Sequence, residues 1–440
     1  MKPTLPLPEI EEATSAIVGE EMHALVAKLF PVCRSITGNG VRQTLQILQD
    51  YIPLVVHEVP SGTPVFDWVV PKEWNIQDAY LLNEAGEKVV DFAANNLHVL
   101  NYSTPINKQL PLQELKKHLF SLPEQPDLIP YKTSYYKPNW GFCLPDRQLQ
   151  TLEEGLYTAV IDATLEDGSL TYGELYLPGE TEDEVLVSSH VCHPSICNDN
   201  LSGIAVATFL ARELAGRKNR YSYRFIFIPA TIGAITWLSQ NENRLANIRH
   251  GLVLTLLGDE ASFTYKRTRE GNFEIDEVVE HVLQACGKGY QLIDFFPYGY
   301  DERQFCSPGF NLPVGCLMRS QHGEFPEYHT SADNLEFVKA GSLAESVALL
   351  LEVTQVLEQN RKYRNTNPKC EPKLGKRGLY DSIAGSGDWK SREMAMFWLL
   401  NLSDGQHSLL AIAKRSGIAF STIAEVAAVL QQHALLEPVT

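Results

Sequence analysis

Short apolar runs alternate with helical patterns through the middle of the chain. The apolar runs predict four strands, over residues 184–189, 223–230, 251–258 and 313–318. Apolar residues at helical spacing predict three helices, over residues 202–216, 273–286 and 338–359. Strands that alternate with helices indicate an α/β sheet. Because the strand runs are apolar at successive positions, we expect both faces of the sheet to be covered.

The segments on either side of this region have different patterns. A helix is predicted over 9–30, and residues 35–52 predict a turn at 38–40 followed by a second helix. Short alternating runs between turn residues then indicate a mostly β segment. Residues 369–390 have the composition of a linker, and three short helical patterns resembling a winged helix follow it, over 392–402, 408–417 and 421–436. We therefore expect three domains: an α/β domain of residues 1–54 and 171–368, an inserted β-rich domain of residues 55–170, and a winged-helix-like domain of residues 376–440.

The composition excludes several classes of protein. The 37 Lys and Arg residues against 54 Asp and Glu residues give a net charge of −17, which argues against a general nucleic-acid binder. We find no apolar run of the ~18–20 residues that a membrane span needs, and no basic and then apolar N-terminal stretch typical of a signal peptide. The eight scattered cysteines are typical of reduced thiols in a cytoplasmic protein. We expect a cytoplasmic protein without nucleic-acid or membrane partners, for which homo-oligomers remain open.

The clearest chemical signal is the segment SSHVCHPSICNDNLSG, residues 188–203. His190 follows a predicted strand, and Asp199 comes just before a predicted helix. Sites in open α/β sheets form beyond the carboxyl ends of strands, so these two side chains can meet there. Histidine and aspartate suit zinc or a similar divalent ion. The alternative is that His190 is a hydrogen-bonded surface residue.

Two further segments carry candidate site residues. In EFPEYHTSADN, His329 is followed by Asp333, a carboxylate that could orient a metal-binding imidazole. In LGDEASF, Asp259 and Glu260 follow a strand and could supply a ligand and a proton-transfer group. The alternatives are an ordinary loop histidine and a solvated acidic turn.

These segments, together with PATIGAITWLS and YDERQFCSPGFNLPVGCLMR, resemble a little-characterised aminopeptidase-like family over nearly the whole chain. The resemblance implies a zinc-aminopeptidase-like (phosphorylase/hydrolase-type) mixed sheet flanked by helices, an inserted β-rich domain and a C-terminal winged helix. It also implies that His190, Asp199 and His329 bind metal. Thr255 and Asp259 compete for one further ligand position, and we favour Asp259 because it can bind metal.

The resemblance also exposes a departure at the end of the strand YRFIFIP. Better-known zinc aminopeptidases carry a Glu-Glu pair there, whereas this chain has Ala230 and Thr231. Thr231 is a trait of the family and implies one zinc ion rather than two. Ala230 stands at the expected general-base position, and a methyl group cannot accept a proton. Three explanations remain open: another carboxylate acts instead (Glu260, Glu327 or Asp333), the chain does not hydrolyse peptides, or the substitution is engineered.

Loop residues around these motifs are candidates for binding a substrate. Arg303 and Arg319 could bind a carboxylate or phosphate, and Tyr300 and Tyr328 could pack on a substrate ring. Ordinary surface arginines and tyrosines in protein packing are the alternatives.

We therefore expect a metal-dependent, aminopeptidase-like hydrolase that cleaves an amide or peptide-type bond of a small or short peptide-like substrate. The resemblance implies a glycan or secondary-metabolite pathway. A divergent or catalytically impaired protein with a binding role or a non-peptidase reaction is the alternative. A transcription factor is disfavoured, because the pattern over 421–436 contains Glu425 and neither Lys nor Arg.

Overall fold

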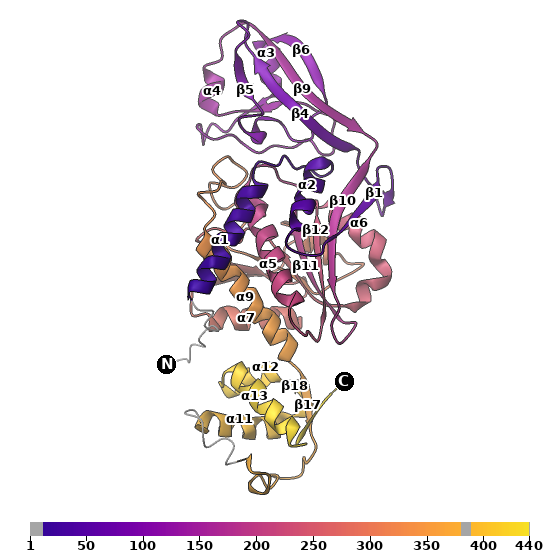
Figure 1. Ribbon diagram of the computed structural model, residues 1–440, viewed down its shortest axis with the longest axis vertical. Helices are drawn as coiled ribbons and strands as arrows, with labels where there is room; N and C mark the ends of the chain where they lie inside the picture. The colour runs from indigo at the N-terminus through magenta and orange to yellow at the C-terminus, as the bar shows by residue number, and fades with distance from the viewer. Residues whose placement is uncertain (1–11, 380–388, 440) are drawn as a thin grey trace. The chain divides into compact units, whose positions relative to one another are not determined.

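The computed structural model describes residues 12–379 and 389–439, and the chain forms two compact units. The larger unit is built on an eight-stranded mixed sheet (Figure 1). Its strands, from one edge to the other, are β1 (Val55–Pro60), β10 (Ser169–Leu177), β12 (Ser222–Ile228), β11 (Glu184–His190), β13 (Ile248–Leu254), β16 (Val314–Met318), β14 (Phe263–Lys266) and β15 (Tyr290–Ile293).

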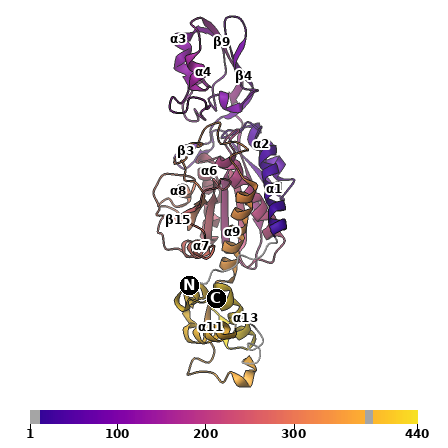
Figure 2. The same ribbon diagram turned by 90° about the vertical axis from the view of Figure 1, so that its left-hand side faces the viewer.

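The four central strands of this sheet run parallel, as buried apolar strands that alternate with helices do. The helices that lie wholly or mostly in this unit are α1 (Glu12–Leu29), α2 (Asn39–Leu48), α5 (Gly203–Ala215), α6 (Ile232–Asn241), α7 (Glu274–Ala285) and α8 (Glu302–Phe305). α9 (Ala340–Gln359) begins in this unit, and its residues from Leu351 onward belong to the smaller one. α5 packs on β11 and β13 and contacts α1. α8 lies on the other side of the sheet from α1 and α2 (Figure 2), and α6 packs against α8. The predicted α/β fold, covered on both faces, is confirmed.

The predicted helix over 9–30 begins at Glu12 in the structure, since residues 9–11 lie outside the described residues. By length and composition, α9 is the one helix of the described residues that could cross a membrane. However, 61% of its apolar window is buried inside the protein, as is common for core helices.

A second sheet is formed by residues of the predicted insert. It is antiparallel, with the order β5 (Lys88–Asp91), β4 (Glu73–Leu82), β9 (Leu156–Glu166) and β6 (Ile106–Pro111). The smaller elements here are β2 (Pro64–Val65), β3 (Trp68–Val69), β7 (Leu119–Phe120), β8 (Phe142–Cys143), α3 (Leu112–Leu115) and α4 (Asp146–Gln150). β1 lies within the range predicted for the insert, yet it pairs with β10 in the large sheet.

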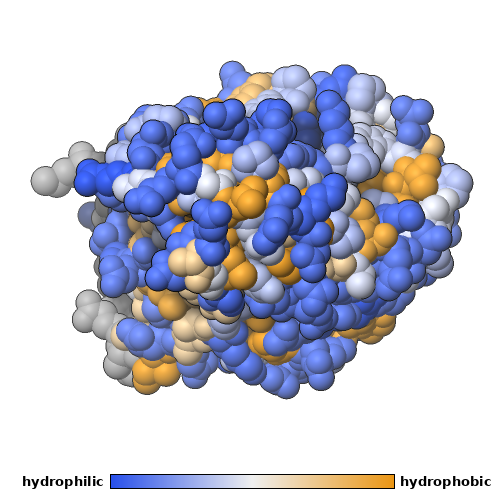
Figure 3. Space-filling model, turned by 90° about the horizontal axis from the view of Figure 1, so that it is seen from above, coloured by the Kyte–Doolittle hydropathy of each residue, from blue (hydrophilic) through white to orange (hydrophobic). Residues whose placement is uncertain are grey.

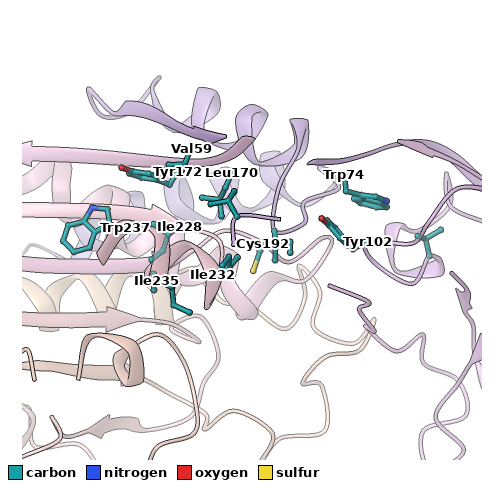
Figure 4. Close-up of a cluster of buried hydrophobic side chains, with 14 of the residues drawn as sticks. Val59, Trp74, Tyr102, Leu170, Tyr172, Cys192, Ile228, Ile232, Ile235 and Trp237 are labelled. Carbon is teal, nitrogen blue, oxygen red and sulfur yellow. The ribbon is translucent and has the colours of Figure 1, made fainter. Parts of the chain in front are cut away.

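The apolar core is continuous between the two sheets. In Figure 4, Trp74 and Tyr102 of the insert belong to the same buried cluster as Ile228, Ile232 and other residues of the large sheet and its helices. This continuity holds the insert against the edge of the sheet where the candidate site lies.

The smaller unit contains the predicted C-terminal domain. Three helices, α11 (Trp389–Leu402), α12 (Leu409–Ser416) and α13 (Phe420–Gln432), accompany a three-stranded antiparallel sheet of β17 (Lys362–Asn365), β18 (Asp404–Ser408) and β19 (Leu436–Pro438). The winged-helix prediction is confirmed. Part of the predicted linker, residues 380–388, lies outside the described residues. The face of the molecule in Figure 3 is mostly hydrophilic with apolar side chains among the polar ones, as on ordinary protein surfaces.

Candidate functional site

His190 is the last residue of β11, in the middle of the parallel part of the sheet. β12 and β13 run parallel to β11 on its two sides, so the loops that follow all three strands open at the same edge. Every residue of β11 is buried, and His190 itself is 2% exposed. The strand thus fixes an imidazole at this edge of the sheet.

Asp199 lies in the turn Cys197–Ser202 before α5, and its carboxylate is the centre of the site. Its Oδ1 lies 2.9 Å from Nε2 of His190, and its Oδ2 lies 3.0 Å from Nε2 of His329. Burial would raise the pKa of Asp199, but His193, His190 and His329 together lower it well below its ordinary value. The carboxylate is therefore held ionised among imidazoles.

His193 belongs to the same cluster. The ligand-type atoms of His190, His193 and Asp199 all lie within 4.8 Å of one another. Burial lowers the pKa of His193 well below its ordinary value, which keeps its imidazole neutral and able to bind a metal. His193 was not among the predicted ligands. Its position three residues after His190 in the same loop is the signal that could have identified it.

Three imidazoles and a buried carboxylate are a donor set that suits zinc. Both oxygens of Asp199 face imidazole nitrogens, and all four side chains lie at the carboxyl edge of the sheet or in the loops beside it. The residues present therefore fit a single ion of the zinc type.

Asp333 holds the backbone of the Asp199 turn. Its Oδ1 accepts a hydrogen bond from the backbone N–H of Asn198 at 2.5 Å, and its Oδ2 accepts one from the N–H of Asp199 at 2.9 Å. Burial raises the pKa of Asp333 to about 8, although these two N–H groups favour the ionised form. We predicted a carboxylate that orients His329 or transfers a proton, whereas the contacts of Asp333 position Asp199.

The other predicted carboxylates lie outside this cluster. Asp259 accepts a hydrogen bond from Nδ2 of Asn198 at 2.7 Å and another from the N–H of Ala261 at 2.7 Å. Glu260 is exposed, and together with Asp259 and Glu327 it lines a separate hollow of about 320 Å³. Their roles as ligand and proton-transfer groups stay predictions.

Two predicted tyrosines lie against the cluster. The ring of Tyr300 stacks on His190 with centroids 5.1 Å apart and an interplanar angle of 21°, and its hydroxyl donates to Oδ1 of Asp199 at 3.4 Å. The ring of Tyr328 stacks on His329 at 3.9 Å and 11°. Both rings form walls of the site, where a substrate group could contact them.

The two predicted arginines differ in their surroundings. The guanidinium of Arg319 is buried and donates to the carbonyl oxygens of Ala261 and Ser342 and to Glu345, so its contacts are structural. Nη2 of Arg303 lies 3.3 Å from the hydroxyl of Thr231, and its Nε is buried with no hydrogen-bond partner among the described residues. Arg303 therefore retains donor capacity beside the site.

Similarity to known proteins decides the family. Residues 23–360 match the family described as a domain of unknown function, DUF4910, and residues 361–438 match a winged helix-turn-helix family. The chain belongs to the DUF4910 family. A Clostridium acetobutylicum protein, provisionally named a polysaccharide biosynthesis protein with an aminopeptidase-like domain, is 56% identical over 423 residues, which are 96% of this chain and 97% of that protein.

Solved structures confirm the fold expected for this DUF4910 protein. A provisionally assigned peptidase from Clostridium acetobutylicum has 54% sequence identity and a TM-score of 0.92, and the match covers 99% of this chain and 100% of that one. A zinc aminopeptidase from Bacillus subtilis has a TM-score of 0.56 at 13% identity, over 77% of this chain and 94% of that one. The larger unit therefore has a zinc-aminopeptidase fold.

The strand end at β12 lacks a carboxylate in this DUF4910 chain. β12 ends at Ile228, and Ala230 and Thr231 occupy the turn before α6. Thr231 has a positive φ of 63°, and its N–H donates at 2.7 Å to Oδ1 of Asp301, a buried residue that we did not predict. A carboxylate from another loop thus reaches this strand end.

The insert also reaches the site through Tyr131. Its backbone N–H donates to the carbonyl oxygen of His329 at 2.8 Å, and its ring lies 4.9 Å from the ring of His193 and 5.0 Å from that of His329. The segment predicted to form the insert therefore contributes one wall of the candidate metal centre.

Proposed function

We propose that this protein is a zinc-dependent hydrolase of an amide or peptide-type bond in a small or short peptide-like substrate. The single observation that carries the proposal is the convergence of three imidazoles on the buried carboxylate of Asp199. The zinc-aminopeptidase fold and the aminopeptidase-like domain in the relative's name support the reaction class.

The protein residues would divide the work as follows. His190, His193, Asp199 and His329 would hold one zinc ion, which would supply a Lewis acid for the carbonyl oxygen and lower the pKa of a bound water. Asp333 keeps Asp199 in place through the two backbone N–H groups it binds.

The surroundings of the cluster suggest the substrate. Tyr300 and Tyr328 would contact the group to be cleaved, and the guanidinium of Arg303, which lies beside Thr231, would bind a carboxylate or phosphate. The relative's name points to polysaccharide biosynthesis, so we propose a cytoplasmic role on an N-acylated or aminoacylated intermediate of a glycan or secondary-metabolite pathway.

The test combines metal analysis with a hydrolysis screen. Protein purified without chelator is analysed for bound metals, loaded with zinc, and assayed on aminoacyl p-nitroanilides and N-acylated amino sugars. About one zinc per chain with turnover, both lost in His190→Asn and retained in the exposed control His433→Asn, would support the proposal. Protein that binds no zinc would contradict it.

A divergent protein that binds metal and does not hydrolyse amides is the second candidate. The methyl group of Ala230 at the expected general-base position favours it. Stoichiometric zinc with no turnover on the whole panel would select this candidate over the hydrolase.

A further inference from the structure

The end of β12 has no carboxylate of its own because Ala230 stands there. A carboxylate from another loop, that of Asp301, lies beside it. Asp301 precedes α8 and is 3% exposed, and its Oδ1 accepts the N–H of Thr231 at 2.7 Å. The described residues, 12–379 and 389–439, offer its Oδ2 no hydrogen bond. One oxygen therefore fixes the carboxylate at the strand end, and the other remains available.

The loop that carries Asp301 is firmly anchored. Nζ of Lys266 donates to the carbonyl oxygen of Tyr298 at 2.7 Å and forms a buried ion pair of 2.8 Å with Glu302. A side chain at Gly299 would place its Cβ 2.8 Å from Oε1 of Glu302, so the glycine permits this close approach. The anchored loop holds Tyr300 on the ring of His190 and Asp301 on Thr231, one residue apart.

We propose that Asp301 is the general base of the hydrolysis, in place of the carboxylate that Ala230 lacks. The proposal rests on the proposed function. In the step, Asp301 takes a proton from the attacking water while the water oxygen bonds to the carbonyl carbon. The C–N bond then breaks, and Asp301 returns the proton to the departing amine nitrogen. One water is consumed, and Asp301 ends ionised as it began.

The electrostatic surroundings suit this role. Burial raises the pKa of Asp301 to about 6, although His190, the Thr231 N–H and Arg303 favour its ionised form and Glu302 opposes it. Among the described residues, Cys192, Tyr136 and Cys316 are further titratable groups that interact with its carboxylate. A base with a pKa near neutrality is ionised at pH 7 and can still take up a proton.

Asp301→Asn separates catalysis from structure. Asparagine keeps an oxygen that can accept the Thr231 N–H, but it has no negative charge and cannot take a proton. With zinc-loaded protein and aminoacyl p-nitroanilides, we expect kcat/KM to fall by about 10²–10⁴-fold at unchanged zinc content and melting temperature. Asp301→Glu should keep part of the activity, and Asp294→Asn, whose side chain is 91% exposed, should match the wild type.

The pH profile and a rescue variant complete the experiment. In the wild type, kcat/KM should rise as pH increases through about 6, and this limb should be absent in Asp301→Asn. Ala230→Glu added to Asp301→Asn should restore turnover. If Asp301→Asn is as active as the wild type, Asp301 is not the general base, and the proposed function still stands. The same conclusion holds if the wild type is inactive and the single variant Ala230→Glu is active. No turnover by any of these proteins would overturn both the proposed function and the role of Asp301.

Discussion

Nε2 of His193 lies 4.0 Å from Oδ2 of Asp199, the carboxylate oxygen that His329 also contacts. We expect His193→Asn to weaken zinc binding at least as much as the loss of an outer-sphere partner does, about 10–100-fold. The reason is that the variant removes one of the three imidazoles. Titration of zinc into metal-free protein by calorimetry measures the change.

A matched substitution keeps this prediction specific. His118→Asn changes a histidine of the predicted insert that stacks on Trp140, and it should leave the zinc affinity unchanged. If His193→Asn binds zinc as tightly as the wild type does, His193 is not a ligand, and His190, Asp199 and His329 are left as the donors.

The sequence pattern predicted the central sheet well, because buried strands and amphipathic helices have distinct periodicities. The predicted strand over 184–189 matches β11, and the predicted helix over 338–359 matches α9. By contrast, β14, β15 and β17–β19 were not predicted. Each of these strands is only three to five residues long, which is too short for an alternating pattern to identify it. The predicted strand over 251–258 also continued past Leu254 into the turn that follows β13.

The sequence identified those site residues that have metal-binding side chains and lie at a predicted strand end or helix start. His190 and Asp199 could be identified because a strand end and a helix start bring them together. Asp301 meets Thr231 across 70 residues of sequence, and no local pattern reports that contact. Arg319 shows the converse, since its charge indicated substrate binding but its side chain packs inward on Ser342 and Glu345.

The large sheet contains a buried ion-pair network around Arg224. Arg224 pairs with Glu184 at 2.6 Å and with Glu174 at 2.5 Å, and its side chain is 5% exposed. Arg224→Met leaves buried carboxylates without their cation, so we expect the free energy of unfolding to fall by about 3–5 kcal/mol. Arg249→Met breaks the exposed pair with Asp183 and should cost only about 0–1 kcal/mol. Urea unfolding of the two variants measures the difference, and equal losses would contradict it.

His250 should make the protein sensitive to acid. Burial lowers the pKa of His250 to about 3 from an ordinary value of 6.5, so between these values the unfolded chain binds a proton that the folded protein does not. Its contribution is therefore fully present above pH 6.5 and is lost as pH falls toward 3. His250→Gln should show a shallower loss of stability over this range, in urea unfolding at several pH values. The exposed control His433→Gln should follow the wild-type curve, and a His250→Gln curve parallel to the wild type would contradict the prediction.

The winged-helix domain should not bind DNA tightly. α13, the third of its helices, contains no Lys or Arg, and its Glu425 pairs with Arg392 at 2.8 Å, which occupies a nearby cation. Contacts with DNA phosphates require such cations, and the net charge of −17 opposes the approach of a polyanion. We test this by fluorescence anisotropy with the full chain and a mixed-sequence DNA duplex at 150 mM salt. We expect a Kd no tighter than about 10 μM, which is typical of non-specific DNA binding. Glu425→Lys adds a cation to α13 and frees Arg392 from its ion pair. Tighter DNA binding by this variant would show that α13 faces the duplex, and unchanged binding would show that it does not. Tight binding by the wild type that weakens steeply with salt would instead assign the domain to DNA.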